Sequence, residues 1–163
     1  MKQDDTVGSR SNNVLAYIAG FLDGDGSLML QIKKRKDGNK STNRFMITIC
    51  FYQDSRHAKP LLWIQKMLGI GYVSHRNDGM SELRINGFRQ AENILTCLLP
   101  FIKFKKIQAK KVLESSKLLQ KSNLKTGDLK KLVRNILAIQ SENYATRKKK
   151  TEIELLTRLG LTP

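Results

Sequence analysis

Two stretches in which apolar and polar residues alternate constrain this chain more than any other feature. The segments 28–33 and 44–51 carry a large apolar side chain at every second position, with mostly polar or basic residues between. A period of two is typical of a β-strand with one apolar and one polar face. The charged segment between them has Asp37-Gly38-Asn39 at its centre and reads as a turn. We therefore expect a long antiparallel hairpin whose apolar face is covered by helices.

Residues at helical spacing lie on both sides of this hairpin. A helix is predicted over 13–24, with Asn13 as its N-cap. A second helix is predicted over 59–68, with Pro60 in its first turn and Gly69 at its end. A short hairpin over 71–76 and 81–87 and a helix over 88–99 before Pro100 follow. Trp63 is expected in the core. The order is αββαββα, an α+β arrangement with the helices on one face of an antiparallel sheet.

The remaining 101–163 segment is expected to form a basic helical extension packed on this core. It begins with a basic helix over 101–121, and a second helix follows Thr126. Thr151 and Glu154 have the spacing of a capping box for a third. Residues 1–12 read as a flexible N-terminal tail. The predicted organisation is thus a tail over 1–12, a core over 13–100 and an extension over 101–163.

The charge balance indicates a class of partner. The 30 Lys and Arg residues against 14 Asp and Glu give a net charge of +16, and a polyanion relieves the self-repulsion of so basic a domain. Nucleic acid is the favoured partner; an anionic membrane surface and a merely solvated basic surface are the alternatives. No apolar run approaches the roughly 18 residues that span a bilayer, and no signal-peptide core is present. Cys50 and Cys97 lack zinc-ligand spacing with the two histidines, so we expect reduced, buried thiols in an intracellular protein.

Small residues recur on one face of the first predicted helix. Ala16, Gly20 and Gly24 are four positions apart, and Ala19 lies beside them. Each glycine inside a helix costs about 1 kcal/mol relative to alanine, whereas small residues at this spacing let two helix backbones approach closely. Either a second helix packs on this face, or the glycines only fit the helix to its own sheet.

The same helix ends in two carboxylates, Asp23 and Asp25. A negative side chain is unfavourable at a helix C-terminus, and a bound cation would reverse that effect. Hard oxygen ligands suit Mg²⁺ or Ca²⁺. An EF-hand loop is excluded, because its sixth position would be Leu28 instead of glycine and its twelfth Lys34 instead of glutamate. A simple Asp-Gly turn into the first strand is the alternative.

The segment from Leu15 to Ser27, LAYIAGFLDGDGS, resembles the motif of the LAGLIDADG homing endonuclease family. The αββαββα order matches the family's fold, with its saddle-shaped sheet, over residues 13–100. Gly69-Ile70-Gly71-Tyr72-Val73 and the basic segment that starts at Pro100 are also similar to family segments. The chain looks most like the single-motif, homodimeric enzymes encoded by organellar group I introns.

The resemblance implies a reaction and a set of residues for it. The family's metal ligands match Asp25 and the Gly24 carbonyl, and its further catalytic positions match Gln53, Lys105 and His57, where His57 replaces the usual arginine. Mg²⁺ is the implied cofactor, with Mn²⁺ substituting and Ca²⁺ binding without supporting turnover. Only one motif is present, so the second acid must come from a second copy in a C2 homodimer. The interface residues would be Ala16, Ala19, Gly20 and Asp23.

The implied substrate is double-stranded DNA with a long, pseudo-palindromic target, cut on both strands to leave 3′ overhangs. The DNA would lie along the polar face of the strands, since a two-stranded ribbon fits the major groove. By alternation that face carries Gln31, Lys33, Arg35, Arg44, Thr48, Ser74, Arg76, Glu82, Arg84 and Asn86.

Other functions remain open at this point. One is a role without cleavage, as a maturase that binds intron RNA or as a DNA-binding module; another is an unrelated RNA-binding protein of ribosomal type. An organelle-encoded enzyme of this kind would act in a chloroplast or mitochondrion.

Overall fold

A single four-stranded sheet organises the molecule. The computed structural model describes residues 11–38, 40–143 and 148–161, so residues 1–10 of the tail expected over 1–12, and Asn39 of the predicted turn, lie outside the described residues. The elements follow in the order α1 (Asn12–Asp25), β1 (Gly26–Asp37), β2 (Lys40–Asp54), η2 (Ser55–His57), α2 (Lys59–Leu68), β3 (Tyr72–His75), β4 (Met80–Asn86), α3 (Phe88–Leu98), α4 (Lys106–Leu119), α5 (Thr126–Glu142) and α6 (Glu152–Arg158). The α+β class and the αββαββα order are confirmed.

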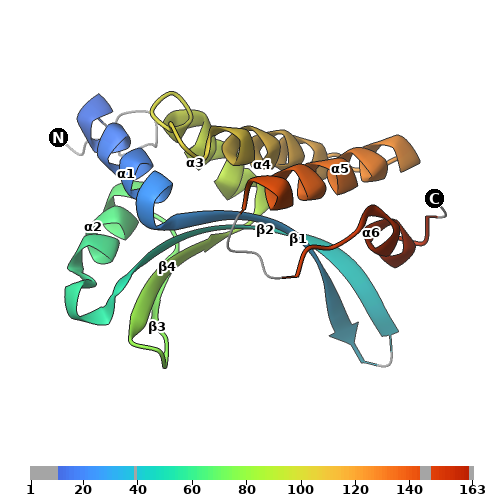
Figure 1. Cartoon of the computed structure of the whole chain (residues 1–163), viewed down its shortest axis with the longest axis horizontal. Coiled ribbons are helices and arrows are strands. Elements are labelled where there is room, and N and C mark those ends of the chain that lie inside the picture. Colours follow the sequence, from blue (N-terminus) through green and yellow to red (C-terminus); the bar gives the residue numbers. More distant parts are fainter. Residues whose placement is uncertain (1–10, 39, 144–147, 162–163) are drawn as a thin grey trace.

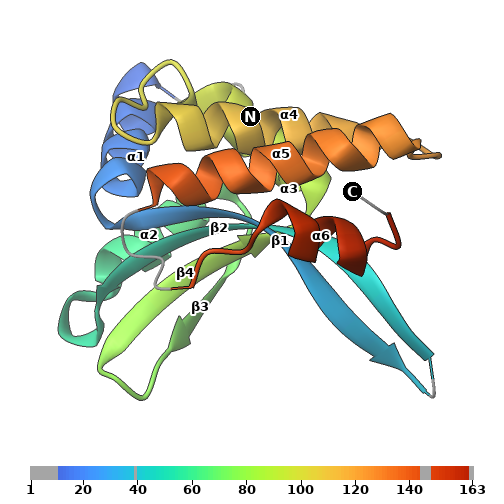
Figure 2. The same ribbon diagram turned by 45° about the vertical axis from the view of Figure 1, so that its right-hand side comes forward.

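The strands are antiparallel and lie in the order β1-β2-β4-β3. Their outer ends bend away from the helices, so that the sheet forms an arch with α3, α4 and α5 over its convex face (Figure 1). The concave face is open below the arch (Figure 2). The β1–β2 pairing runs from Gly26 opposite Phe51 to Asp37 opposite Lys40.

The apolar face of the strands forms the core, as the alternation predicts. Leu28, Ile49 and Leu83 are at most 2% exposed and lie beneath the helices. Two β2 side chains on the opposite, concave face are also buried: Thr48 at 1% and Cys50 at 0%. They sit on β2, a central strand with neighbours on both sides, so alternation alone overestimates their exposure. Burial raises the pKa of the Cys50 thiol.

Some local predictions are confirmed and others are wrong. The α2 bounds match, with Gly69 in the left-handed conformation after the helix, and Thr151 forms its capping box with Glu154. The N-cap of α1 is Ser11 instead of Asn13, because the Ser11 hydroxyl accepts the Val14 N–H at 3.4 Å.

Three further predictions differ from the structure. Trp63 is 37% exposed and packs edge-on against a ring of α1 instead of entering the core. The expected helix over 101–121 begins only at Lys106, because a buried carboxylate described below holds the preceding residues in a loop. Cys97 is half-buried instead of fully buried.

The C-terminal helices share the core of the sheet. Val112 of α4, Val133 of α5 and Leu156 of α6 belong to the same apolar cluster as Ile18 and Ile49. The Asn43 side chain donates a hydrogen bond to the carbonyl oxygen of Arg158, which links the β1–β2 hairpin to α6. We therefore propose that the 101–163 extension and the 13–100 core fold as one unit. None of the described helices is both long and apolar enough to span a membrane.

Replacing Gly71 by alanine tests the close packing of the second hairpin. The Gly71 φ angle is +100°, and an added Cβ would lie 2.8 Å from Ile85 Cγ1 and 3.0 Å from the Arg84 carbonyl oxygen. We expect Gly71→Ala to lower the free energy of unfolding by about 2 kcal/mol or more, measured by urea denaturation. The matched control is Gly79→Ala, which has φ +79° but nothing within 4 Å. Equal losses in both variants would contradict this account of Gly71.

Candidate catalytic site at the end of α1

The last turn of α1 brings the two motif carboxylates to different environments. Asp23 is buried, at 8% exposure, whereas Gly24 and Asp25 are exposed. No basic side chain occupies this last turn, so the negative end of the helix and the Asp25 carboxylate face the same region without a local counter-charge from the helix. This end of α1 therefore favours a cation.

The Asp23 carboxylate ties α1 to the loop before α4. One oxygen accepts the Lys103 and Phe104 backbone N–H groups at 2.6 and 3.2 Å, and the other accepts the Lys105 N–H at 2.9 Å. The Lys105 ammonium group donates back to the Asp23 carbonyl oxygen. Lys105 is therefore held at the end of α1, one residue from Gly24. The interface role predicted for Asp23 finds no support in this inward orientation.

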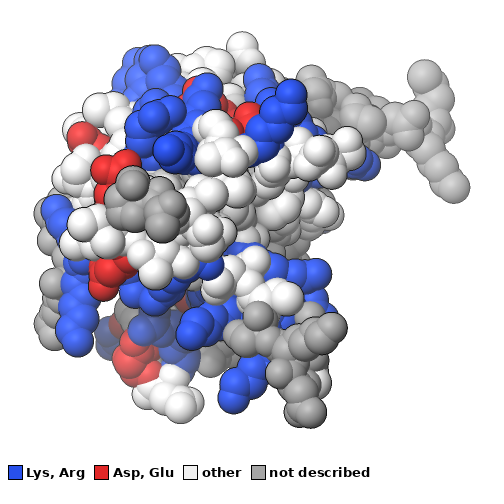
Figure 3. Space-filling model, turned by 90° about the vertical axis from the view of Figure 1, so that its right-hand side faces the viewer, with Lys and Arg blue, Asp and Glu red and all other residues white. Residues whose placement is uncertain are grey.

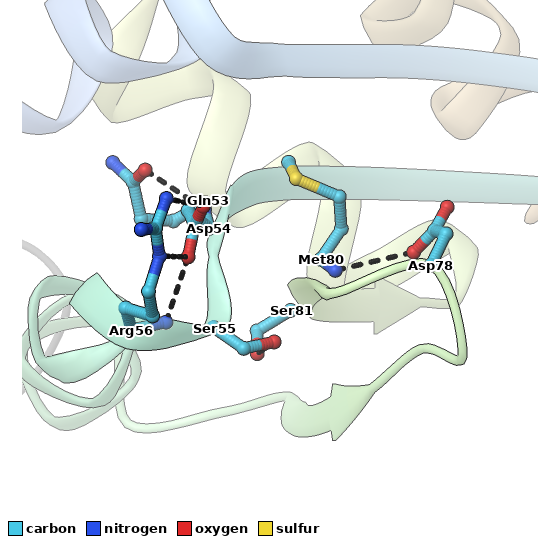
Figure 4. A network of polar contacts seen from close by, with 7 residues as sticks. All are labelled: Gln53, Asp54, Ser55, Arg56, Asp78, Met80 and Ser81. Carbon is cyan, nitrogen blue, oxygen red and sulfur yellow. Dashed lines mark hydrogen bonds and ion pairs between the residues drawn. The ribbon is translucent and has the colours of Figure 1, made fainter.

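Gln53 lies on the neighbouring strand. Phe51 of β2 is paired with Gly26, the residue that follows Asp25, so the end of β2 runs beside the end of α1. The Gln53 side-chain oxygen accepts the Asp54 N–H at 2.8 Å, which fixes the amide at the strand end (Figure 4). The structure thus brings Asp25, Gly24, Lys105 and Gln53 to one region from three separate chain segments.

Asp54 and Arg56 form a tight ion pair next to Gln53. Arg56 Nε donates to Asp54 Oδ1 at 3.0 Å and Nη2 donates to Oδ2 at 2.8 Å, while the Arg56 backbone N–H donates to Oδ1 at 2.8 Å. These hydrogen bonds hold the pKa of the Asp54 carboxyl well below its usual range. His57 is the last residue of η2 and is exposed.

Sequence reasoning missed Asp54 and Arg56. The available signal was an aspartate two residues before an arginine at a strand end, where the carboxylate caps the following turn. That pattern predicts a local turn but does not say that the guanidinium folds back onto the same carboxylate.

The concave face of the sheet carries most of the side chains predicted to contact DNA. The exposed or half-exposed ones are Gln31, Lys33, Arg35, Arg44, Ser74, Arg76, Arg84 and Asn86. Thr48 is buried and donates a hydrogen bond to the Asn86 side-chain oxygen at 2.8 Å. Glu82 is only 7% exposed, accepts a hydrogen bond from Arg84 Nε at 3.1 Å and forms an ion pair with Arg84 Nη2 at 2.9 Å. Thr48 and Glu82 therefore orient neighbours on this face instead of presenting free groups.

Positive charge dominates the end of the molecule where the β1–β2 hairpin comes forward. Figure 3 shows many Lys and Arg side chains there and few Asp or Glu. Lys33, Lys34, Arg35, Lys36 and Arg44 are all exposed along the hairpin. Of these, Lys33, Arg35 and Arg44 lie on the concave face, and a row of cations on such a surface is the electrostatic footprint of nucleic-acid binding.

The small residues of α1 divide between its two faces. Ala16 and Gly20 are exposed, and a Cβ added at Gly20 or Gly24 would meet nothing within 4 Å. Ala19 is fully buried in the core of its own chain, so it offers no surface to a partner, and its predicted interface role is not supported. The glycines are therefore not needed to fit α1 to its own sheet.

An apolar surface continues this open face of α1. Tyr17 is 55% exposed and its ring packs edge-on against Trp63 of α2, with ring centroids 5.3 Å apart. Together with Val14 and Pro60, the two rings line a surface hollow of about 440 Å³.

The donor set at the end of α1 suits a metal shared with other molecules. Among the described residues, no group of three or more His, Cys, Asp and Glu side chains gathers into a metal site. One carboxylate and one carbonyl from a single chain are too few to enclose an ion. Mg²⁺ is commonly held by one or two carboxylates together with substrate phosphates, so Asp25 and the Gly24 carbonyl fit an ion whose remaining ligands come from outside this chain.

Comparison with known proteins connects this site to a family. The family model described as LAGLIDADG endonuclease matches residues 18–120. DNA endonuclease I-CvuI of Chlorella vulgaris is 44% identical over 100 residues, 61% of each chain. DNA endonuclease I-CreI of Chlamydomonas reinhardtii is 35% identical over 100 residues, 61% of this chain and 60% of the relative. The matched stretch thus spans about three fifths of these curated relatives.

Solved structures extend the similarity over most of the chain. The crystal structure of I-CvuI in complex with its target in the presence of Ca has a TM-score of 0.74 at 31% identity, covering 91% of this chain and 96% of that one. The archaeal intron-encoded homing endonuclease I-Vdi141I, complexed with DNA, has a TM-score of 0.77 at 21% identity over 93% of this chain and 97% of that one. At that identity the second likeness shows the fold alone.

The fold is that of homing endonucleases with a four-stranded, arched sheet. Because the family model covers well over half of its length, this chain belongs to the LAGLIDADG endonuclease family.

Replacing Asp23 by alanine tests its role as the tie between α1 and the 103–105 loop. The variant leaves three backbone N–H groups without their buried acceptor, so we expect a loss of about 3 kcal/mol in the free energy of unfolding. Asp78→Ala is the control, since the Asp78 carboxylate also accepts a backbone N–H, from Met80 at 3.2 Å, but on the exposed surface. Its loss should be much smaller, and comparable losses would contradict the role of Asp23.

Proposed function

We propose that the protein is a site-specific, divalent-metal-dependent endonuclease that cuts both strands of a long, pseudo-palindromic DNA target and leaves 3′ overhangs. The observation that carries this proposal is the exposed Asp25 at the end of α1, with Lys105 held beside it by the buried Asp23. Membership of the LAGLIDADG endonuclease family and the names of its relatives support the same reaction.

Each side chain of the site has a proposed part in phosphodiester hydrolysis. Asp25 and the Gly24 carbonyl hold Mg²⁺, which when bound polarises the phosphate and lowers the pKa of a ligated water. Mn²⁺ substitutes, and Ca²⁺ binds without supporting turnover. Gln53 orients the attacking water by hydrogen bonding, and the Lys105 ammonium group stabilises the charge that builds up on the phosphate oxygens. His57, which is exposed at the end of η2, matches the position of the family's usual arginine and is one candidate for a further cation at this site.

The concave face of the sheet is the proposed DNA-binding surface. Its exposed Arg and Gln side chains have the donors and acceptors that read guanine and adenine in the major groove. Exposed lysines such as Lys34 and Lys36 on the opposite side of the hairpin suit phosphates, which position the protein without reading sequence.

We propose further that the enzyme is a C2 homodimer in which α1 packs against α1 of a second copy. The exposed positions of Ala16 and Gly20 allow close approach, and the Tyr17–Trp63 pair extends the apolar surface beside them. This arrangement brings two Asp25 carboxylates together, which supplies the ligands that one chain lacks. Action in a chloroplast or mitochondrion remains a proposal that rests on the family resemblance.

The first test is cleavage of a randomised duplex-DNA library in Mg²⁺ by the wild-type protein and by Asp25→Asn. We expect discrete double-strand cuts by the wild type, no cuts in EDTA, and at least a 1,000-fold loss in Asp25→Asn, because the variant loses the charge that holds the metal. The unfolding midpoint and DNA binding in EDTA should stay near wild type, since Asp25 is exposed.

The cut products also report on the alternatives. A folded wild-type protein that binds DNA but never cuts it would refute the endonuclease and favour a binding module. Binding to a structured intron RNA in preference to duplex DNA would favour a maturase.

Replacing Gly20 by leucine tests the homodimer. In the monomer the added side chain meets open space, and leucine is the better helix former by nearly 1 kcal/mol, so the single chain should be at least as stable. If α1 packs closely on its copy, the larger side chain prevents that contact, and sedimentation should show a monomer that no longer cuts.

The matched control is Gly127→Leu, a glycine of α5 that is also exposed with nothing within 4 Å. It should sediment and cut like the wild type. A dimer that survives Gly20→Leu unchanged would place the interface elsewhere.

A further inference from the structure

The Asp54–Arg56 pair is built to hold a cation in a defined place. The Arg56 side chain is 82% exposed, and an exposed arginine normally samples many rotamers. Here the Asp54 carboxylate binds it side-on through Nε and Nη2. An ion pair this exposed contributes little to stability, so folding alone does not account for an arginine held in one orientation.

The turn that carries the pair is itself anchored. The Ser55 N–H donates to the Gly79 carbonyl oxygen at 2.9 Å, and the Ser55 and Ser81 hydroxyls are hydrogen-bonded at 2.8 Å. Ser81 is fully buried and is also hydrogen-bonded to His75 Nδ1 at 2.6 Å. Through these contacts the β3–β4 hairpin fixes the backbone on which Asp54 and Arg56 stand (Figure 4).

The remaining donors of Arg56 suit a phosphate. A guanidinium has five N–H groups, and Asp54 uses one on Nε and one on Nη2, which leaves the two on Nη1 and one on Nη2. This edge matches two oxygens of a phosphate in a bidentate contact. The Gln53 amide lies beside the guanidinium, because both are bonded to Asp54, and β2 places them next to the end of α1.

We propose that Arg56 is a catalytic residue that contacts a phosphate of the cut DNA strand, and that Asp54 is the positioning residue that orients it. This inference rests on the proposed endonuclease and goes beyond it, because it places the working cation at position 56 and not at His57. Asp54 offsets part of the Arg56 charge, so Arg56 adds little to overall attraction for DNA and acts mainly on the rate.

The test uses the full-length protein and the duplex that the wild type selects from the library. Single-turnover cleavage with protein in excess is measured beside DNA affinity in EDTA. We expect Arg56→Gln to cut about 100-fold more slowly while its Kd changes by less than about threefold, and Arg56→Lys to recover only part of the rate, since it keeps the charge and loses the fork. Arg89→Gln makes the same change on the exposed surface of α3 and should cut at the wild-type rate.

Asp54→Asn tests the positioning role, because it keeps an oxygen to cap the turn and removes the charge that holds the guanidinium. We expect it to lower the rate about tenfold when Arg56 is present and not to lower it further in an Arg56→Gln background. An equal drop in both backgrounds would refute positioning through Arg56.

Two results would overturn the proposal for Arg56. One is a wild-type rate in Arg56→Gln, above all with a large loss in His57→Gln, which would assign the cation to His57. The other is an unfolding midpoint in Arg56→Gln so low that the protein is not folded at the assay temperature. A wild-type protein that binds the duplex without cutting it would instead refute the endonuclease itself, and this inference with it.

Discussion

A single buried carboxylate organises the centre of this molecule. Asp23 accepts three successive backbone N–H groups from the 103–105 loop, and so joins the first helix to a segment 80 residues later. A charge in this position is tolerable because charge-assisted hydrogen bonds satisfy both of its oxygens. The same contact explains why the chain turns before α4 instead of continuing as a helix. It also delivers Lys105 to the end of α1, where Asp25 stands exposed.

The neighbouring carboxylate has the opposite environment, although only one glycine separates the two. Asp23 points inward and its role is structural, whereas Asp25 points outward from the negative end of the helix. The two residues are both aspartates, and only their positions in the structure show that their roles differ. On the other side of the same region, β2 ends with Gln53 and the Asp54–Arg56 pair, so that separate elements converge around the end of α1.

Much of the fold could be predicted from the sequence, because its main determinants are local and periodic. Alternation predicted the long hairpin and its buried face, and Pro60 with Gly69 predicted the bounds of α2. Failures occurred where a side chain's environment depends on residues far away in the chain. Thr48 is buried by the strands on either side of β2, and Trp63 packs against Tyr17 outside the core. Ser11 outcompetes Asn13 as the cap of α1, which sequence rules do not rank.

The sequence predicted only those residues of the candidate site that match a motif or a position of the family. Asp25 lies in a long, specific segment, and the family resemblance indicated Gln53 and Lys105. The Asp54–Arg56 contact was not predictable, because it depends on how the 3-10 turn folds back on itself. Ala19 and Asp23 were predicted at a dimer interface, Ala19 beside the small residues of α1 and Asp23 from the family resemblance, but both side chains are buried in their own chain.

The spacing of side chains along β1 determines how many base pairs separate the contacts that its concave face could make with a duplex. Successive residues on one face of a strand are about 6.8 Å apart, close to twice the roughly 3.4 Å between stacked base pairs. In the proposed complex, Gln31, Lys33 and Arg35 would therefore step along the groove about two base pairs at a time, and Arg44, which is paired with Lys33, would reach the duplex at the same step. Each such step would then be read by a facing pair, so a change of preferred sequence there would require both members of the pair to be altered together.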